Sequence, residues 1–223
     1  MGTIGALAQT AELTELPLKL YLEGAIAADK VAFDDNHTVV YEFMAKALSI
    51  QEDGVADSKE RIRCLNLIVG ALLATSNLPA ENWEPLTSQA YLAAAKIFKK
   101  PDQVRCLCTV ANLYWHGRVA EGNGETLKNG KKVADILRKA SKIASECMER
   151  LVQQQLFISL INVYMQFQQQ GCQEINMENI EELVARTQKN TVNLDVSAEA
   201  DALERELADA VQRLKLVQGS QQE

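Results

Sequence analysis

The sequence predicts an all-α protein, built as a right-handed α-solenoid of antiparallel helix pairs of the HEAT or armadillo kind. Apolar residues recur at helical spacing along most of the chain, and Val, Ile and Thr show no sustained strand-like alternation. The four prolines and eleven glycines cluster between the periodic segments. Adjacent segments are centred about 22 residues apart, so a helix pair repeats at about 45 residues, within the roughly 40–47 of HEAT and armadillo repeats.

Five amphipathic segments fill the first half of the chain. Their apolar stripes lie at 18–26, 39–48, 62–73, 86–98 and 104–115. Asp57 and Glu60 precede the third segment at the spacing of a capping box, in which each side chain bonds a backbone N–H of the other residue. Phe98 falls on the apolar side of the fourth segment, and Pro101 ends that segment and begins the fifth.

A loop at residues 116–130 comes next, and four further segments follow it. Their stripes lie at 133–147, 156–167, 180–184 and 203–214, of which the last two are weaker. Short connections make neighbouring helices antiparallel, and each pair covers its apolar stripe by stacking on the next pair. The segment at 156–167 also carries Phe157, Ile158 and Ile161 off its main stripe. We therefore expect it to be buried on two sides, with a partner protein as a candidate for the second.

We interpret residues 1–223 as a single α-solenoid fragment. The opening letters IGALAQTAE are typical of the end of a helix, which places the end of a truncated preceding helix at 3–12. Helix-pair repeats are expected over 14–190, and a terminal helix with a tail over 191–223.

Composition favours a protein partner. The net charge of -7 argues against nucleic acid and against anionic lipid, because both need an excess of Lys and Arg. The five cysteines show no framework spacing and lie in apolar stretches, as in a cytoplasmic protein. No apolar run approaches the roughly 20 residues that span a bilayer, so we expect no direct membrane insertion.

Residues that would support catalysis are sparse. The two histidines, His37 and His116, fall on different predicted elements, so we expect no metal site. Cys106 and Cys108 are two residues apart and therefore on different faces of a helix, which disfavours joint ligation. We expect a protein that is not an enzyme and holds neither cofactor nor metal.

Charge is distributed unevenly between two turns. The stretch from Gln51 to Glu60 is acidic, and the stretch from Lys96 to Arg105 is basic. Two interpretations stay open: solvated helix ends, or a contact between two copies of the chain. Lys96, Lys99 and Lys100 share one helix face, so they could meet the acidic turn of a second copy.

Large aromatic residues and Arg are enriched at protein interfaces, and both occur near the end of the fifth segment. Tyr114, Trp115, His116 and Arg118 lie together there. Core packing is the alternative for the Trp115 indole, and the sequence leaves both open.

Several segments resemble the C-terminal region of the large retromer subunit, the vacuolar protein sorting-associated protein 35 family. They are LPLKLYLEGAIAA, TVVYEFMAKALSI, DSKERI, EPLTSQAYLAAAKIFKKPDQ, LYWHGR, NGKKVADILRKASKIASECM and LVQQQLFISLINVY. The resemblance runs in order from about Ile4 to Val163 and thins after Gln170.

The resemblance implies a non-catalytic scaffold of the retromer endosomal sorting complex. In that family this region is an α-solenoid whose concave surface curls around the small, metallophosphoesterase-like retromer subunit. The expected location is cytoplasmic, peripherally on endosomal membranes, among endosomal coat and regulator proteins. The arrestin-like subunit binds the family's N-terminal half, so we do not expect it to bind this chain.

The resemblance also suggests contact residues. Candidates for the small retromer subunit are Asn112, Trp115, Phe157 and Tyr164. Self-association into a homodimer would use Glu52, Asp53, Lys96, Lys99 and Lys100. Gly54 stands where the family commonly has an acidic residue, which weakens the acidic side of that pairing.

A second function stays open. A solenoid can present a groove for short cargo or regulator peptides, and such grooves usually carry a ladder of Asn or Trp at repeat spacing. Trp83 and Trp115 make only a short ladder.

Overall fold

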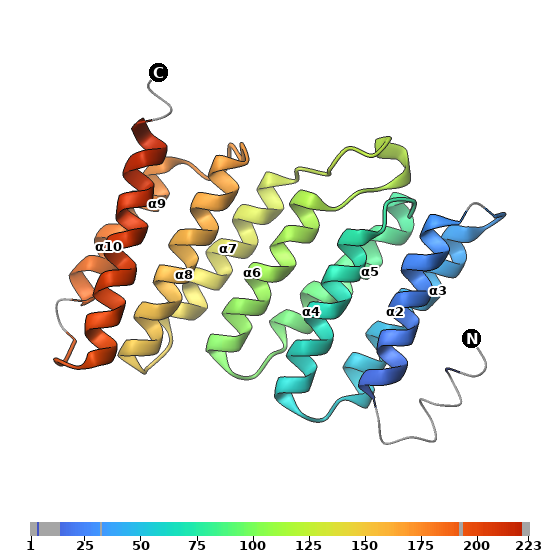
Figure 1. The fold of residues 1–223 in the computed structure, drawn as a ribbon, viewed down its shortest axis with the longest axis horizontal. Helices are drawn as coiled ribbons and strands as arrows, with labels where there is room; N and C mark the ends of the chain where they lie inside the picture. Colours follow the sequence, from blue (N-terminus) through green and yellow to red (C-terminus); the bar gives the residue numbers. More distant parts are fainter. Residues whose placement is uncertain (1–3, 5–13, 32, 192–193, 220–223) are drawn as a thin grey trace. The chain divides into compact units, whose positions relative to one another are not determined.

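The computed structural model describes residues 4, 14–31, 33–191 and 194–219 (Figure 1). The helices of this part are α2 (Glu15–Lys30), α3 (Asn36–Ser49), α4 (Ser58–Ala74), α5 (Ala80–Ala95), α6 (Lys100–His116), α7 (Gly130–Ser145), α8 (Arg150–Gln169), α9 (Met177–Thr191) and α10 (Ala198–Gly219). A π-helical turn, Ile50–Gly54, and a 3-10 turn, Ala120–Gly122, complete it. Over these ranges the only extended pairing is an isolated bridge between Arg118 and Thr126. The predicted fold class, an all-α solenoid of antiparallel helix pairs, is confirmed.

The chain divides into two compact units. Unit 1 comprises Met1–Phe98 and Thr109–Asn129, and unit 2 comprises Lys99–Cys108 and Gly130–Glu223. The division falls within α6, which gives its first half to unit 2 and its second half to unit 1.

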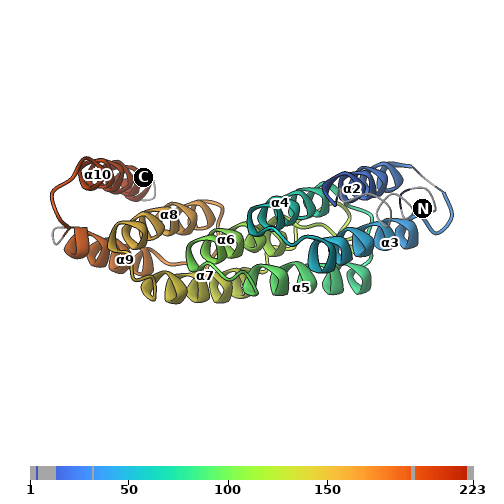
Figure 2. The same ribbon diagram turned by 90° about the horizontal axis from the view of Figure 1, so that it is seen from below.

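Unit 1 is a double layer of helices. The helices α2 and α4 pack side by side in one layer, and α3 and α5 form the other (Figure 2). The apolar stripes that the sequence predicts meet between these layers, where Leu18, Met44, Leu65 and Trp83 are almost completely buried. The rings of Tyr21 and Phe43 add a tilted aromatic contact between α2 and α3, with centroids 5.9 Å apart.

Unit 2 is organised around α8. This helix packs against α7, α9 and α10, and α7 and α9 lie in the same layer (Figures 1 and 2). Phe157, Ile158 and Ile161 are buried, as predicted for a helix covered on two sides. In the structure these three side chains are covered by residues of the chain itself.

Two sequence predictions need correction. Phe98 is 97% exposed, because α5 ends at Ala95 and residues beyond that point no longer follow the helical period. The capping box is only half formed. Asp57 Oδ1 accepts a hydrogen bond from the Glu60 N–H at 2.9 Å, but the Glu60 carboxylate accepts one from the Thr14 hydroxyl at 3.1 Å.

The structure describes part of the expected ends. The helix end predicted at 3–12 lies, apart from Ile4, outside the described residues. At the other end α10 occupies Ala198–Gly219.

Candidate protein-binding surface

The two candidate contacts of unit 1 lie near the end of α6. Trp115 is 5% exposed, so most of its indole belongs to the core. Asn112 is half-buried, and its side-chain amide donates to the Thr109 carbonyl at 3.1 Å. Trp115 is therefore mainly a core residue, and Asn112 is the more accessible of the two.

The loop after α6 is held by backbone hydrogen bonds. The N–H groups of Leu127 and Asn129 donate to the carbonyls of Gly117 and Tyr114, each at 2.9 Å. The Glu121 carboxylate accepts from the Ala80 N–H at 3.1 Å. This places a negative charge at the N-terminus of α5, where the helix dipole favours it. The loop is thus a fixed part of unit 1.

Phe157, the first candidate of unit 2, is fully buried. The Arg186 guanidinium carbon lies 4.8 Å from its ring centroid, in a cation–π arrangement. A partner could reach this ring only after Arg186 had moved. Phe157 therefore holds Arg186 in place, and the surface seen by a partner is the guanidinium.

Tyr164, the second candidate of unit 2, lies in a groove between α7 and α9. The groove has a volume of about 470 Å³. Its lining residues are Ala134, Arg138, Ser141, Lys142, Ser145, Tyr164, Glu174, Ile175, Asn179, Glu182, Leu183 and Arg186. Burial raises the pKa of Tyr164 to about 12. The phenol therefore keeps its proton at neutral pH and remains a hydrogen-bond donor.

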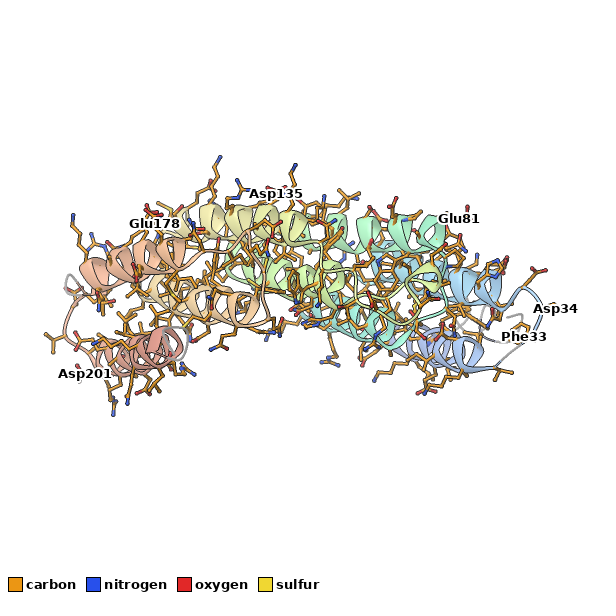
Figure 3. The ribbon with its side chains drawn as sticks, turned by 90° about the horizontal axis from the view of Figure 1, so that it is seen from above. Phe33, Asp34, Glu81, Asp135, Glu178 and Asp201 are labelled. Atoms are coloured by element: carbon orange, nitrogen blue, oxygen red, sulfur yellow. The ribbon has the colours of Figure 1, made fainter. Side chains whose placement is uncertain are left out.

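The exposed face of α7 is basic. Its exposed charged side chains are Lys131, Lys132, Asp135, Arg138, Lys139 and Lys142, five cations against one anion. The chain as a whole carries a net charge of -7, so this helix face is a local reversal of sign. Figure 3 shows Asp135 of α7 and Glu178 of α9 on the same outer side of unit 2.

The groove between α7 and α9 contains two cations without a carboxylate partner among the described residues. Arg138 pairs with Asp135, but no ion pair forms there at Lys142 or at Arg186. The carboxylates on the lining are Glu174 and Glu182.

The candidate residues for self-association form ion pairs within one chain. In unit 1, Lys96 Nζ lies 2.6 Å from Glu52 Oε1, and this hydrogen bond lowers the pKa of the Glu52 carboxyl. In unit 2, Lys100 Nζ lies 3.1 Å from Glu146 Oε2. Asp53 and Lys99 are exposed, and neither forms an ion pair with any residue that the structure describes.

Chemically reactive groups are buried or dispersed. Burial raises the pKa of the Cys64 and Cys106 thiols to about 11 and that of Cys108 to about 12, so all three remain protonated at neutral pH. In the described ranges no three His, Cys, Asp or Glu residues converge to hold a metal ion. No described helix has the length and apolar character needed to cross a membrane.

Sequence reasoning missed the two cations of the groove. Lys142 belongs to a run of Lys and Arg at helical spacing on α7, a signal that a helical projection reveals. Arg186 gave no such signal, because its position depends on the packing of α9 above Phe157.

Comparison with known proteins identifies the family. Residues 1–190 match the profile of the family described as vacuolar protein sorting-associated protein 35. The chain is 33% identical over 201 residues to vacuolar protein sorting-associated protein 35 of Schizosaccharomyces pombe, covering 90% of this chain and 23% of that protein. It is 33% identical over 177 residues to protein 35A of Arabidopsis thaliana, covering 76% of this chain and 22% of that protein.

Protein 35C of Arabidopsis thaliana is 30% identical over 194 residues, covering 83% of this chain and 24% of that protein. The chain thus spans less than a quarter of the length of these relatives. Since the family profile covers most of the chain and the relatives are about one third identical, the chain belongs to the vacuolar protein sorting-associated protein 35 family.

Proposed function

We propose that this chain is a non-catalytic scaffold of the retromer endosomal sorting complex and binds the small, metallophosphoesterase-like retromer subunit. The observation that carries the proposal is the family match over residues 1–190, in a chain folded as an all-α solenoid. The relatives' names place them in vacuolar protein sorting. The protein then acts in the cytoplasm, peripherally on endosomal membranes, with coat and regulator proteins as its neighbours.

The proposed contact surface gives different roles to the four candidate residues. Tyr164 lines the groove of unit 2, where a partner can contact it. Its hydroxyl keeps its proton and can therefore donate a hydrogen bond to that partner. Asn112 offers a half-buried amide in unit 1. Trp115 and Phe157 act from beneath the surface, because their rings are buried and support the residues that a partner touches.

The test measures the affinity of the purified chain for the small retromer subunit by isothermal titration calorimetry. Tyr164→Phe removes one hydroxyl and keeps the packing, so we expect binding to weaken about fivefold, the value of one hydrogen bond of about 1 kcal/mol. Tyr41→Phe is the matched control, since Tyr41 is a half-buried tyrosine of α3 outside the candidate set, and we expect no change.

Two results would count against the proposal. A wild-type chain that does not bind the small subunit would contradict the scaffold function. Equal affinities of wild type and Tyr164→Phe would remove the Tyr164 hydroxyl from the contact. The non-catalytic role is checked by a phosphoesterase assay with and without divalent metal, where we expect no turnover.

Self-association belongs to the same proposal. The residues involved are Glu52, Asp53, Lys96, Lys99 and Lys100. Of these, Asp53 and Lys99 form no ion pair within the described part of the chain.

The groove between α7 and α9 favours a second candidate function, the binding of short cargo or regulator peptides. Its volume of about 470 Å³ lies within the roughly 300–1,000 Å³ of ligand pockets.

A further inference from the structure

A second groove of unit 2 lies between the first turns of α8 and α10, which begin at the same edge of the unit (Figure 1). This α8–α10 groove has a volume of about 830 Å³. A smaller cavity of about 430 Å³ adjoins it, and Arg150 and Leu194 line both. Asp201 of α10 lies on the opposite side of unit 2 from Asp135 of α7 (Figure 3). The α8–α10 groove is therefore separate from the groove between α7 and α9, with which it shares none of its described lining residues.

Apolar side chains line part of the α8–α10 groove. Leu151 and Val152 of α8 are half-buried there, and Leu203 of α10 is the third large apolar residue that the two helices contribute. Two further apolar residues, Met148 and Val196, adjoin lining residues in the sequence and are 98% and 97% exposed. Covering apolar surface of this kind with a partner's side chain is favourable, because it removes that surface from water.

Four carboxylates line the same groove. They belong to Glu149, Asp195, Glu199 and Glu206, and none of them forms an ion pair within the described residues, where Arg150 is the one cation on the lining. The helix dipole accounts for Glu149 and Glu199, which lie at the N-termini of α8 and α10. Glu206 lies in the middle of α10, where the dipole gives it no such role. The groove thus has a net negative charge that a cation from a partner would balance.

The adjoining cavity contains a buried hydrogen-bond acceptor, the side-chain oxygen of Gln154. This residue is 2% exposed, and no donor among the described residues reaches its Oε1 atom. Its Nε2 atom donates to Gln153 Oε1 at 3.4 Å. A buried acceptor without a donor costs free energy, so a ligand that brings an N–H group into the cavity would recover that cost on binding.

We propose that the α8–α10 groove binds a basic segment of a partner protein. Lys or Arg side chains of the segment pair with the groove carboxylates, an apolar side chain covers Leu151 and Val152, and an N–H group donates to Gln154 Oε1. An acidic segment or an anionic lipid surface does not fit, because the carboxylates would repel it. The inference goes beyond the proposed function, since it assigns a ligand to residues outside the four candidate contacts.

A second copy of the chain fits this groove less well than a basic segment does. The exposed face of α7 is basic, so its charge would suit the groove. However, no large apolar side chain is exposed along Gly130–Ser145, and the apolar part of the groove would stay uncovered.

The test is fluorescence anisotropy with the full chain at low salt. The probe is a fluorescein-labelled peptide of Lys, Leu and Phe. It is compared with a peptide in which Glu replaces Lys and with one in which Ser replaces Leu and Phe. We expect the first peptide to bind, the Glu peptide not to bind, and the Ser peptide to bind at least about tenfold more weakly than the first.

Variants of α10 separate the groove from general charge. We expect Glu206→Lys to weaken binding of the Lys, Leu and Phe peptide at least about tenfold. Glu204→Lys is the matched control, because it makes the same charge change on α10 at an exposed position outside the groove lining. We expect this control to weaken binding less than about twofold.

Gln154→Leu tests the buried acceptor. It removes the Oε1 atom and nearly keeps the size of the side chain, so we expect binding to weaken about fivefold, the value of one hydrogen bond. Thermal denaturation by circular dichroism checks that each variant keeps its fold. If Gln154→Leu has lost structure, Glu206→Lys carries the conclusion, because Glu206 is exposed and its replacement leaves the core intact.

Four results would overturn the proposal. The first is no binding of the Lys, Leu and Phe peptide. The second is an equal loss for Glu204→Lys and Glu206→Lys, and the third is equal affinity for the peptide with Ser in place of Leu and Phe. The fourth is self-association, measured by sedimentation equilibrium of the chain alone, that Glu206→Lys abolishes and Glu204→Lys preserves, because this would assign the groove to a second copy. Unchanged binding by a folded Gln154→Leu variant would contradict the role of the Gln154 oxygen.

Discussion

Asp29, at the end of α2, connects this helix to the segment between α4 and α5. It is 4% exposed, and its carboxylate accepts hydrogen bonds from the backbone N–H groups of Ser76 at 3.1 Å and Asn77 at 3.0 Å. The Asn77 side-chain amide returns a hydrogen bond to the Asp29 carbonyl at 2.7 Å. A buried carboxylate is tolerated here because backbone donors surround it.

We expect Asp29→Asn to destabilise the protein despite its unchanged size. An amide offers one oxygen in place of two, so one backbone N–H would face the NH2 group and lose its acceptor. Leaving a buried donor unsatisfied costs about 1–3 kcal/mol. Urea denaturation followed by circular dichroism measures the free energy of unfolding. Asp34→Asn, at an exposed position, is the control, and an equally small effect of both changes would contradict the role of Asp29.

Whether a contact could be predicted depends on how far apart its two residues lie in the sequence. The Asp57 cap was predictable, because its donor lies three residues away. The contact of Asp29 with Ser76 spans 47 residues, and that of Thr14 with Glu60 spans 46, so neither leaves a local pattern. These partners are fixed only when one helix pair stacks on the next.

At the scale of elements, the loop between α6 and α7 depends on close packing between Gly117 and the Trp83 ring. A Cβ atom at this position would overlap the Trp83 ring and the Leu113 carbonyl oxygen. The loop can therefore pack against Trp83 of α5 because Gly117 has no side chain. The Gly117 carbonyl also accepts a hydrogen bond from the Leu127 N–H at 2.9 Å.

We expect Gly117→Ala to lower the free energy of unfolding by about 1–3 kcal/mol, the usual cost of overpacking a core. Gly70→Ala is a control of opposite sign. Gly70 lies in α4 with no atom within 4 Å of its added Cβ, so alanine should raise stability by about 0.5–1 kcal/mol through its helix propensity. Thermal and urea denaturation of both variants measure this. Equal effects of the two substitutions would show that the contact with Trp83 is unimportant.

Helices were predictable and the groove was not, for a physical reason. A helix such as α7 needs only its own apolar period, which the sequence shows at 133–147. The groove exists because α7 and α9 stand apart over Tyr164 of α8, and such a gap depends on side chains of three helices. The prediction that Phe98 lies on the apolar side was wrong for a related reason. The helical period of apolar residues continues in the sequence, but α5 ends at Ala95.

At the scale of the whole molecule, two of the lysines proposed for self-association already form ion pairs within one chain. The pairs Lys96–Glu52 and Lys100–Glu146 are exposed, and exposed pairs contribute little to stability. Their side chains can therefore exchange partners at little cost. Within the described part of the chain, Asp53 and Lys99 are exposed and form no ion pair. They are therefore the candidate residues with which a second copy could pair directly.

We expect the chain to form a homodimer that weakens as salt screens these charges. Lys99→Glu alone and Asp53→Lys alone should each favour the monomer, because each places like charges at both ends of a two-fold contact. An equimolar mixture of the two variants should dimerise again, since both contacts are then attractive. Sedimentation equilibrium at low and high salt measures this, with Lys30→Glu as a control on α2. A mixture that stays monomeric while wild type dimerises would place the interface elsewhere, because only a direct contact between residues 53 and 99 is restored by exchanging their charges.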